Sequence, residues 1–284
     1  MGSGDDSPAR GAYGLKLPDV PAAAELLVPA PEPWTSWRLD QRPPDAADAP
    51  LADMLGPDAA RVALSGGGWV ELDRRARSST LVLPARPADT ELVHPYLAAT
   101  AAVCARWRGW NCVHSGAIVV DGGAWGVLGD KEAGKSSTVA WFALESAAGV
   151  LCDDVLVIDA DGRALAGPRC VDLREDAAGH FGVGEALGVV GARERWRMRL
   201  EPTPAAVPLR GWVELAWGDE LALEPFGPTE LLPAIVRNFS VRLMPPDADA
   251  LMDLAALPAW RLTRPRDLER LSDAGRLLLG ALGG

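Results

Sequence analysis

The chain has 284 residues, a formal net charge of -11, a pI near 4.8 and 48% hydrophobic residues. A chain of this size and composition can bury a sizeable core, as one large domain or two small ones. The negative charge repels polyanions on average, which argues against DNA or RNA as a partner. No apolar run approaches the roughly 20 residues of a membrane span, so we expect a cytoplasmic protein without a membrane segment.

The beginning of the chain is predicted to be unstructured, and the stretch after it to be rich in strands. Met1–Gly4 has the composition of a cloning remnant, and small polar residues follow it, so we expect residues 1–16 to be a disordered tail. Residues 17–95 are expected to form a small β-rich N-terminal layer. Its clearest strand candidates are 61–65, 69–73 and 80–84, the first two joined by a glycine hairpin at 66–68.

The rest of the chain, residues 96–284, alternates predicted strands and helices. Pro95 is expected to open an apolar helix that ends before Gly109 and is buried on nearly all sides. A tight turn at 121–123 is expected to join two strands. The predicted strands are 113–120, 124–128, 150–158, 212–217, 221–224 and 260–263, and the predicted helices are 229–238, 248–256 and a last helix opened by Pro265.

The segment Gly129–Ser136 fits the phosphate-binding pattern G-x-x-x-x-G-K-[ST] at every fixed position. Its glycines let main-chain N–H groups point at phosphate oxygens, Lys135 supplies a compact positive charge, and the Ser136 hydroxyl can bind Mg²⁺. A predicted strand before it and a predicted helix after it argue against an ordinary surface turn. The expected nucleotide-binding residues are Gly129, Asp130, Lys131, Glu132, Ala133, Gly134, Lys135, Ser136 and Ser137.

Two adjacent carboxylates, Asp153 and Asp154, interrupt an apolar predicted strand. Buried carboxylates are costly unless a cation or a hydrogen-bond network compensates them. Neighbouring strand residues point to opposite faces, so both can reach one site only at the end of the strand. There, one would complete a Mg²⁺ shell and the other could accept a proton from an attacking hydroxyl. The alternative is a strand-end turn in which one aspartate caps a neighbour.

Three motifs taken together resemble the nucleotide-binding core of HPr kinase/phosphorylase and related bacterial kinases, a group that includes the lasso-peptide precursor kinases. They are His114-Ser115-Gly116, the loop Gly129–Ser136, and Asp153-Asp154-Val155, which follows Lys135 closely. The resemblance is strongest over 114–159 and extends, more distantly, to ATP-dependent phosphoenolpyruvate carboxykinases. It implies an α/β fold with an HPr kinase/PEP carboxykinase-like P-loop core and a mixed sheet.

The resemblance also implies an activity and a set of roles. It suggests a kinase that uses ATP and Mg²⁺, with Asp153 as the acid/base residue, Asp154 as a metal ligand beside Ser136, and His114 tuning the base. The acceptor would be a Ser or Thr hydroxyl on a precursor peptide or small protein, as in the biosynthesis of ribosomally made peptides. The chain carries no clear copy of the C-terminal arginine- and glycine-rich signature of HPr kinases, which points away from HPr as substrate.

Two other functions fit the same motifs. A small-molecule hydroxyl kinase and a nucleotide-binding regulator without phosphotransfer are alternatives, and a homo-oligomer is compatible with the sequence.

The four cysteines form no C-x-x-C pair and lie in apolar surroundings, so we expect buried free thiols. Arginine suits a phosphoryl clamp, although each arginine could equally lie on a solvated face. The candidates are Arg169, Arg174, Arg197 and Arg199.

Overall fold

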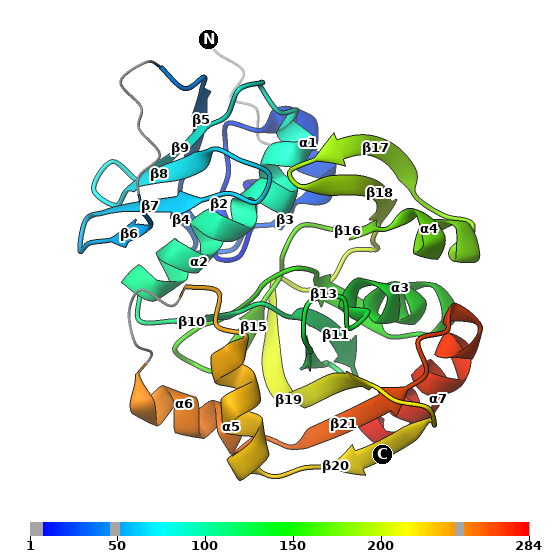
Figure 1. Cartoon of the computed structure of the whole chain (residues 1–284). Helices are drawn as coiled ribbons and strands as arrows, with labels where there is room; N and C mark the ends of the chain where they lie inside the picture. The colour runs from blue at the N-terminus through cyan, green and yellow to red at the C-terminus, as the bar shows by residue number, and fades with distance from the viewer. Residues whose placement is uncertain (1–7, 46–51, 242–246, 284) are drawn as a thin grey trace.

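The computed structural model describes residues 8–45, 52–241 and 247–283, which together form a mixed α/β structure (Figure 1). This agrees with the predicted α/β class and mixed sheet. Met1–Gly4, expected to be a cloning remnant, lies outside these ranges. Within them, no helix combines the length and the apolar character needed to cross a bilayer.

A nine-stranded central sheet carries the phosphate loop. Its strands run in the order β10-β14-β15-β19-β12-β11-β13, with β21 beside the second half of β19 and β20 outside β21. Pairing is parallel between β12 and β19 and between β19 and β21, and antiparallel elsewhere. The strands are β10 (Asn111–Val113), β11 (Gly116–Val120), β12 (Gly123–Leu128), β13 (Gly149–Cys152), β14 (Leu156–Ile158), β15 (Arg163–Leu165), β19 (Ala206–Trp217), β20 (Ala222–Pro225) and β21 (Ala259–Arg264).

β12 is the strand that positions the site. All six of its residues are buried, as expected for an apolar strand in the middle of a sheet with both faces covered. The chain leaves β12 at Leu128, forms the phosphate loop and enters a helix at Lys135. Because β12, β19 and β21 are parallel, their carboxyl ends lie at the same edge of the sheet as this loop.

The N-terminal part is rich in strands, as predicted, and contains two further sheets. One has the order β3-β1-β2-β4 and the other the order β5-β9-β8-β7-β6. The glycine hairpin predicted at 66–68 joins β7 to β8. The strands are β1 (Arg10–Ala12), β2 (Leu15–Lys16), β3 (Val28–Pro29), β4 (Thr35–Ser36), β5 (Arg38–Arg42), β6 (Met54–Leu55), β7 (Ala59–Ala63), β8 (Trp69–Asp73) and β9 (Ser78–Val82).

The prediction of a disordered tail over residues 1–16 is wrong for the part that the structure describes. β1 and β2 form a hairpin, and Ala12 and Leu15 are fully buried. The Tyr13 hydroxyl donates a hydrogen bond to the main-chain oxygen of Asp153 at 3.2 Å. Few apolar residues mark this segment in the sequence, and its partners lie as far as 140 positions away, so the local pattern could not reveal it.

Helices cover the sheets, and a three-stranded sheet of order β16-β18-β17 lies beside α4. The apolar helix predicted after Pro95 begins at Leu97, and the last helix begins at Leu271 instead of directly after Pro265. The remaining elements are η1 (Pro21–Leu26), α1 (Asp89–Glu91), η2 (Leu92–Tyr96), α2 (Leu97–Trp107), α3 (Lys135–Glu145), β16 (Cys170–Leu173), α4 (Glu175–Phe181), β17 (Glu185–Val190), β18 (Arg193–Arg199), α5 (Pro228–Arg237), α6 (Ala248–Ala255), η3 (Leu268–Arg270) and α7 (Leu271–Leu282).

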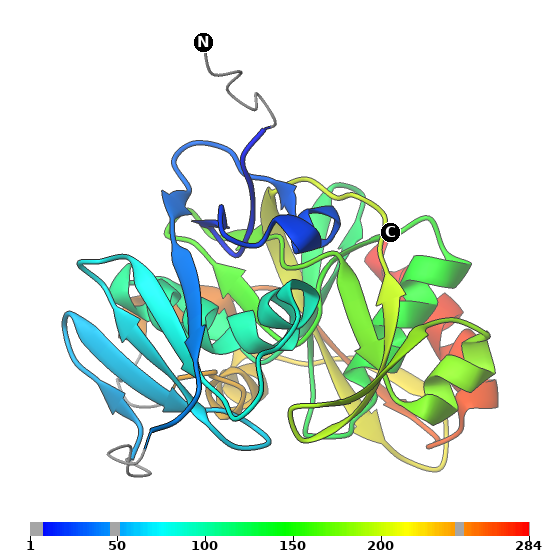
Figure 2. The same cartoon turned by 90° about the horizontal axis from the view of Figure 1, so that it is seen from above.

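α2 joins the N-terminal layer to the central sheet. It contacts β8 on one side and β10 and β14 on the other, and Figure 2 shows it between the two regions. One hydrophobic cluster continues across residue 95, from Leu81 through Leu97 to Cys112. A second cluster packs α3 and α7 against the central sheet around Trp141 and Phe142. The N-terminal sheets therefore share a core with the region that carries the phosphate loop.

The predicted strand at 150–158 is two strands. β13 ends at Cys152 and pairs with β11, whereas β14 begins at Leu156 and pairs with β10 and β15. Apolar residues on both sides of the acid pair give no signal that the strand partners change there. As a result, Asp153 and Asp154 lie where the chain crosses between two parts of the sheet. The predicted strand at 113–120 is likewise interrupted, at His114 and Ser115.

Candidate active site

The phosphate loop has the backbone that its sequence predicts. Gly129 has φ +152° and Gly134 has φ +83°, both in the region that L side chains rarely adopt. A Cβ at Gly129 would lie 2.9 Å from the Cβ of Ala133, and one at Gly134 would lie 2.4 Å from a guanidinium nitrogen of Arg264. Both positions therefore require glycine, and the loop leads directly into α3, whose N-terminus favours anions.

The Lys135 side chain folds back over the phosphate loop. Its ammonium donates hydrogen bonds to the main-chain oxygens of Gly129, at 2.7 Å, and Asp130, at 3.1 Å. The residue is buried, and this burial lowers its pKa while the nearby aspartates raise it. Among the described residues it forms no salt bridge. A cation held only by carbonyl oxygens is available to an incoming anion.

Asp153 lies against the residue expected to bind Mg²⁺. The Ser136 hydroxyl is 3.1 Å from one carboxylate oxygen of Asp153 and 3.0 Å from the other. Asp153 is only 3% exposed, and burial, followed by the charge of Asp154, raises its pKa to about 7. A buried carboxylate next to a hydroxyl, without a salt bridge to any described residue, is a donor set that fits Mg²⁺.

Asp154 and His114 lie together on the open side of this arrangement. Asp154 is half-buried and has φ +71°, a left-handed conformation that aspartate tolerates better than most residues. His114 follows β10, and its main-chain N–H donates to Asn238 O at 2.6 Å. His114 is exposed on the cavity side, yet partial removal from water and the charge of Lys135 lower its pKa, whereas Asp154 raises it through its charge and a main-chain hydrogen bond. The sequence prediction that the loop, the two aspartates and His114 share one site is compatible with this geometry.

The arginine candidates differ in what they contact. Arg174 forms an ion pair with Glu132 of the phosphate loop at 2.7 Å, so it lies at the site. Arg169 donates to the main-chain oxygens of Glu25 and Leu200, and Arg199 pairs with Glu25, which places both away from the loop. Arg169 and Arg199 therefore stabilise the packing of the N-terminal layer.

Arg197 is a structural residue, in contrast to the prediction that it could hold a phosphoryl group. It is buried and donates two hydrogen bonds to Asp172, at 2.8 and 2.9 Å. It also donates to the main-chain oxygens of Thr90 and His94, and so fastens the start of η2 to β18. All three guanidinium nitrogens thus donate to groups inside the protein, as expected for a buried guanidinium, which must be paired.

His94, Cys170 and Asp172 are buried, and one potential ligand atom of each lies within 4.8 Å of the others. Asp172 already accepts hydrogen bonds from Arg195 and Arg197. These two positive charges neutralise the carboxylate and would repel a metal ion bound beside it. We interpret this group as a buried charge network.

The four cysteines are all buried free thiols, as the sequence predicts.

Arg264 is a residue of the site that the sequence did not reveal. It comes from β21 and is 2% exposed, and its guanidinium lies 3.3 Å from Ala133 O and 3.2 Å from the Thr138 hydroxyl, below the loop. It stacks over Trp217 at 4.4 Å and forms no salt bridge with any described residue. Burial alone lowers its pKa to about 10. More than 120 positions separate it from the loop, so no local pattern indicates the contact.

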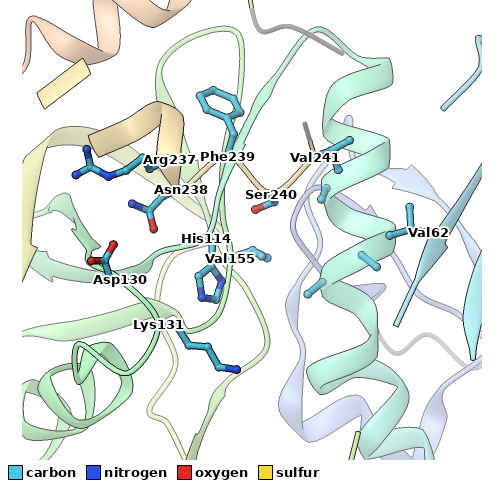
Figure 3. A pocket seen from close by; sticks show the side chains of 13 residues that line it. Val62, His114, Asp130, Lys131, Val155, Arg237, Asn238, Phe239, Ser240 and Val241 are labelled. Carbon is cyan, nitrogen blue, oxygen red and sulfur yellow. The ribbon is translucent and has the colours of Figure 1, made fainter. Parts of the chain in front are cut away.

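Two cavities open next to the first residues of the phosphate loop. The larger, about 690 Å³, extends from Asp130, Lys131 and His114 to the face of α2 (Figure 3). The smaller, about 320 Å³, lies between the loop and the end of β19 near Trp217. The larger cavity is the one that brings His114 and the loop together with space for a second molecule.

Comparisons with known proteins add little to this geometry. No protein-family model matches the chain, and no curated protein sequence is significantly similar to it. A solved structure of the Hpr(Ser) kinase/phosphatase from Coxiella burnetii is similar with a TM-score of 0.29 and 8% identity, covering 60% of this chain and 96% of that chain. A TM-score this low does not establish a common fold, so the case for a phosphate site rests on the loop and the residues around it.

Proposed function

We propose that this protein is an ATP-dependent kinase that phosphorylates a Ser or Thr hydroxyl on a peptide or small protein. The observation that carries the proposal is the contact between Ser136 and Asp153 at the mouth of a complete phosphate loop. A loop of this kind cradles phosphates with main-chain N–H groups, and a serine–aspartate pair beside it is suited to the accompanying metal ion. His114, Asp154 and the larger cavity lie next to this point and supply room for an acceptor.

The geometry favours a particular role for each residue of the site. Ser136 and Asp153 would hold Mg²⁺, which neutralises phosphate charge during transfer. Lys135 would leave the loop carbonyls for the outer phosphates of ATP. Asp154, the more exposed carboxylate, would accept the proton of the acceptor hydroxyl, and His114 would orient it. This order reverses the roles of Asp153 and Asp154 that the sequence resemblance implied, because Ser136 donates to Asp153.

The transfer itself then needs only positioning and charge stabilisation. The acceptor oxygen attacks the γ-phosphorus while its proton passes to Asp154, and the bond from the γ-phosphorus to the bridging oxygen breaks, releasing ADP. Lys135 offsets the charge that develops on the transferred group. Arg174, which already pairs with Glu132 of the loop, is the arginine best placed to assist. Burial keeps Asp153 and Lys135 away from bulk water.

The test is phosphate transfer from labelled ATP to peptides encoded beside the gene, using the full chain with Mg²⁺. Asp154→Asn should abolish labelling but keep affinity for Mg-ATP, whereas Asp161→Asn, an exposed residue of the β14–β15 turn, should change neither. Binding of ATP without labelling, and indifference to Asp154→Asn, would support the nucleotide-binding regulator instead. Labelling of a small hydroxyl compound but of no peptide would support the small-molecule kinase.

A further inference from the structure

The larger cavity has two chemically different walls. One is polar and consists of Asp130 and Lys131 of the phosphate loop with His114. The opposite wall is α2, which presents Ala98, Ala99 and Ala102, here called the alanine face. Figure 3 shows His114 between the loop and this helix. An acceptor that reaches the loop must therefore lie partly against α2.

Apolar groups close the cavity around the alanine face. Val62 comes from β7 in the N-terminal layer, Val155 follows the acid pair, and Phe239 and Val241 come from the segment after α5. These groups lie on separate elements that converge only in the folded chain. Methyl-sized side chains on α2 leave the space that a larger residue would fill. The site is thus shaped for an apolar group next to the reacting hydroxyl.

The polar groups deeper in the cavity are mostly used within the protein. Arg237 forms an ion pair with Glu214 at 3.1 Å, and the Asn238 side chain donates to Ala234 O at 2.8 Å. Ser240 is different, because among the described residues its buried hydroxyl has no partner other than the Cys112 thiol, which forms only weak hydrogen bonds. A weakly paired hydroxyl in a cavity wall is costly to bury, and a polar group of a bound molecule would satisfy it.

We infer that this cavity binds a peptide segment in which an apolar residue next to the phosphorylated Ser or Thr packs on the alanine face. This inference rests on the proposed kinase function and adds the sequence context of the acceptor. The main chain of the peptide offers both donors and acceptors, one of which can reach Ser240. The N-terminal layer, through Val62 and α2, is then part of the substrate-recognition surface.

The experiment uses the full chain, Mg²⁺, labelled ATP and a peptide library with one fixed serine and randomised neighbours. We expect one neighbouring position to select Leu, Ile, Val or Phe over Ala by roughly ten- to hundredfold in kcat/KM, the factor that burial of such a side chain supplies. Ala98→Phe, which partly fills the cavity, should lower that preference at least about tenfold and leave the dissociation constant of ATP unchanged.

Matched measurements separate the possible failures. Ala160→Phe, an exposed position at the other end of β14, should leave both the preference and the turnover unchanged. Thermal unfolding shows whether Ala98→Phe still folds, and Ala99→Leu is a milder change on the same face. Phosphorylation without any neighbour preference overturns the inference and leaves the kinase standing. Weaker ATP binding by Ala98→Phe and Ala99→Leu would assign the cavity to the nucleoside and overturn it too. Binding of ATP with no labelled peptide in any library overturns both.

Discussion

Replacing Asp153 with Asn should stabilise the protein in the absence of Mg²⁺ and nucleotide. Burial, followed by the charge of Asp154, raises the pKa of Asp153 from its ordinary value of 3.8 to about 7. A carboxyl whose pKa is raised on folding contributes stability below pH 3.8, and this contribution is lost as the pH rises through 7. A rise of this size corresponds to at most about 4 kcal/mol.

The assay is urea unfolding in EDTA between pH 4 and pH 8.5, followed by the fluorescence of the eleven tryptophans. The Asn variant should be more stable than the natural chain at pH 8, by up to about 4 kcal/mol, and the difference should vanish near pH 4. Asp161→Asn, an exposed change nearby in the chain, should show no such pH-dependent difference. If the two proteins differed in unfolding free energy by the same amount at every pH, the raised pKa of Asp153 would be refuted. With Mg-ATP present the order should reverse, because Asp153 would then be compensated.

Three other changes test separate parts of the site. Lys135→Met should weaken Mg-ATP binding at least about tenfold in calorimetry without lowering the unfolding temperature, because its ammonium contacts only loop carbonyls. Arg264→Gln should weaken binding of ATP and of inorganic tripolyphosphate about tenfold, and Arg264→Lys should weaken it less, because the buried charge acts on the phosphates. Equal losses in both variants would indicate a purely structural role. Arg197→Met should cost roughly 3–5 kcal/mol in urea unfolding, because it leaves the buried Asp172 with only the longer contact to Arg195, at 3.4 Å, as a hydrogen bond.

The parts of the fold that the sequence predicts are those that local chemistry determines. The phosphate loop follows from glycine positions and from the strand and helix that flank it, and each of these is visible within about 25 residues. The hairpins at 66–68 and 121–123 follow from turn residues in the same way. A helix that is apolar on nearly all sides, such as α2, can also be predicted to be buried, because it has no polar face to turn to solvent.

Structural features that depend on residues far away in the chain could not be predicted from the local sequence. Apart from its two aspartates, the segment 150–158 has the composition of one strand, yet β13 and β14 pair with different neighbours and place the acid pair at the crossing. Arg197 has the sequence context of an exposed strand arginine, and only the fold brings Asp172 within 2.8 Å of it. The hairpin at the start of the chain is held by distant partners: Tyr13 contacts the main chain of Ala166 and Asp153, and Ala12 and Leu15 are buried in the core.

The site is built from both ends of the chain, and this has a consequence for its stability. Tyr13 contacts the acid pair from the N-terminal hairpin, and Arg264 supports the phosphate loop from β21. Neither contact is local, so the support that each gives to the acid pair or to the loop depends on strands that lie far apart in the sequence. Arg264 also lies close to Gly134, whose φ of +83° already favours glycine, since a Cβ there would meet its guanidinium at 2.4 Å. The familiar loop pattern is thus held, in this protein, by a buried cation that the pattern itself does not specify.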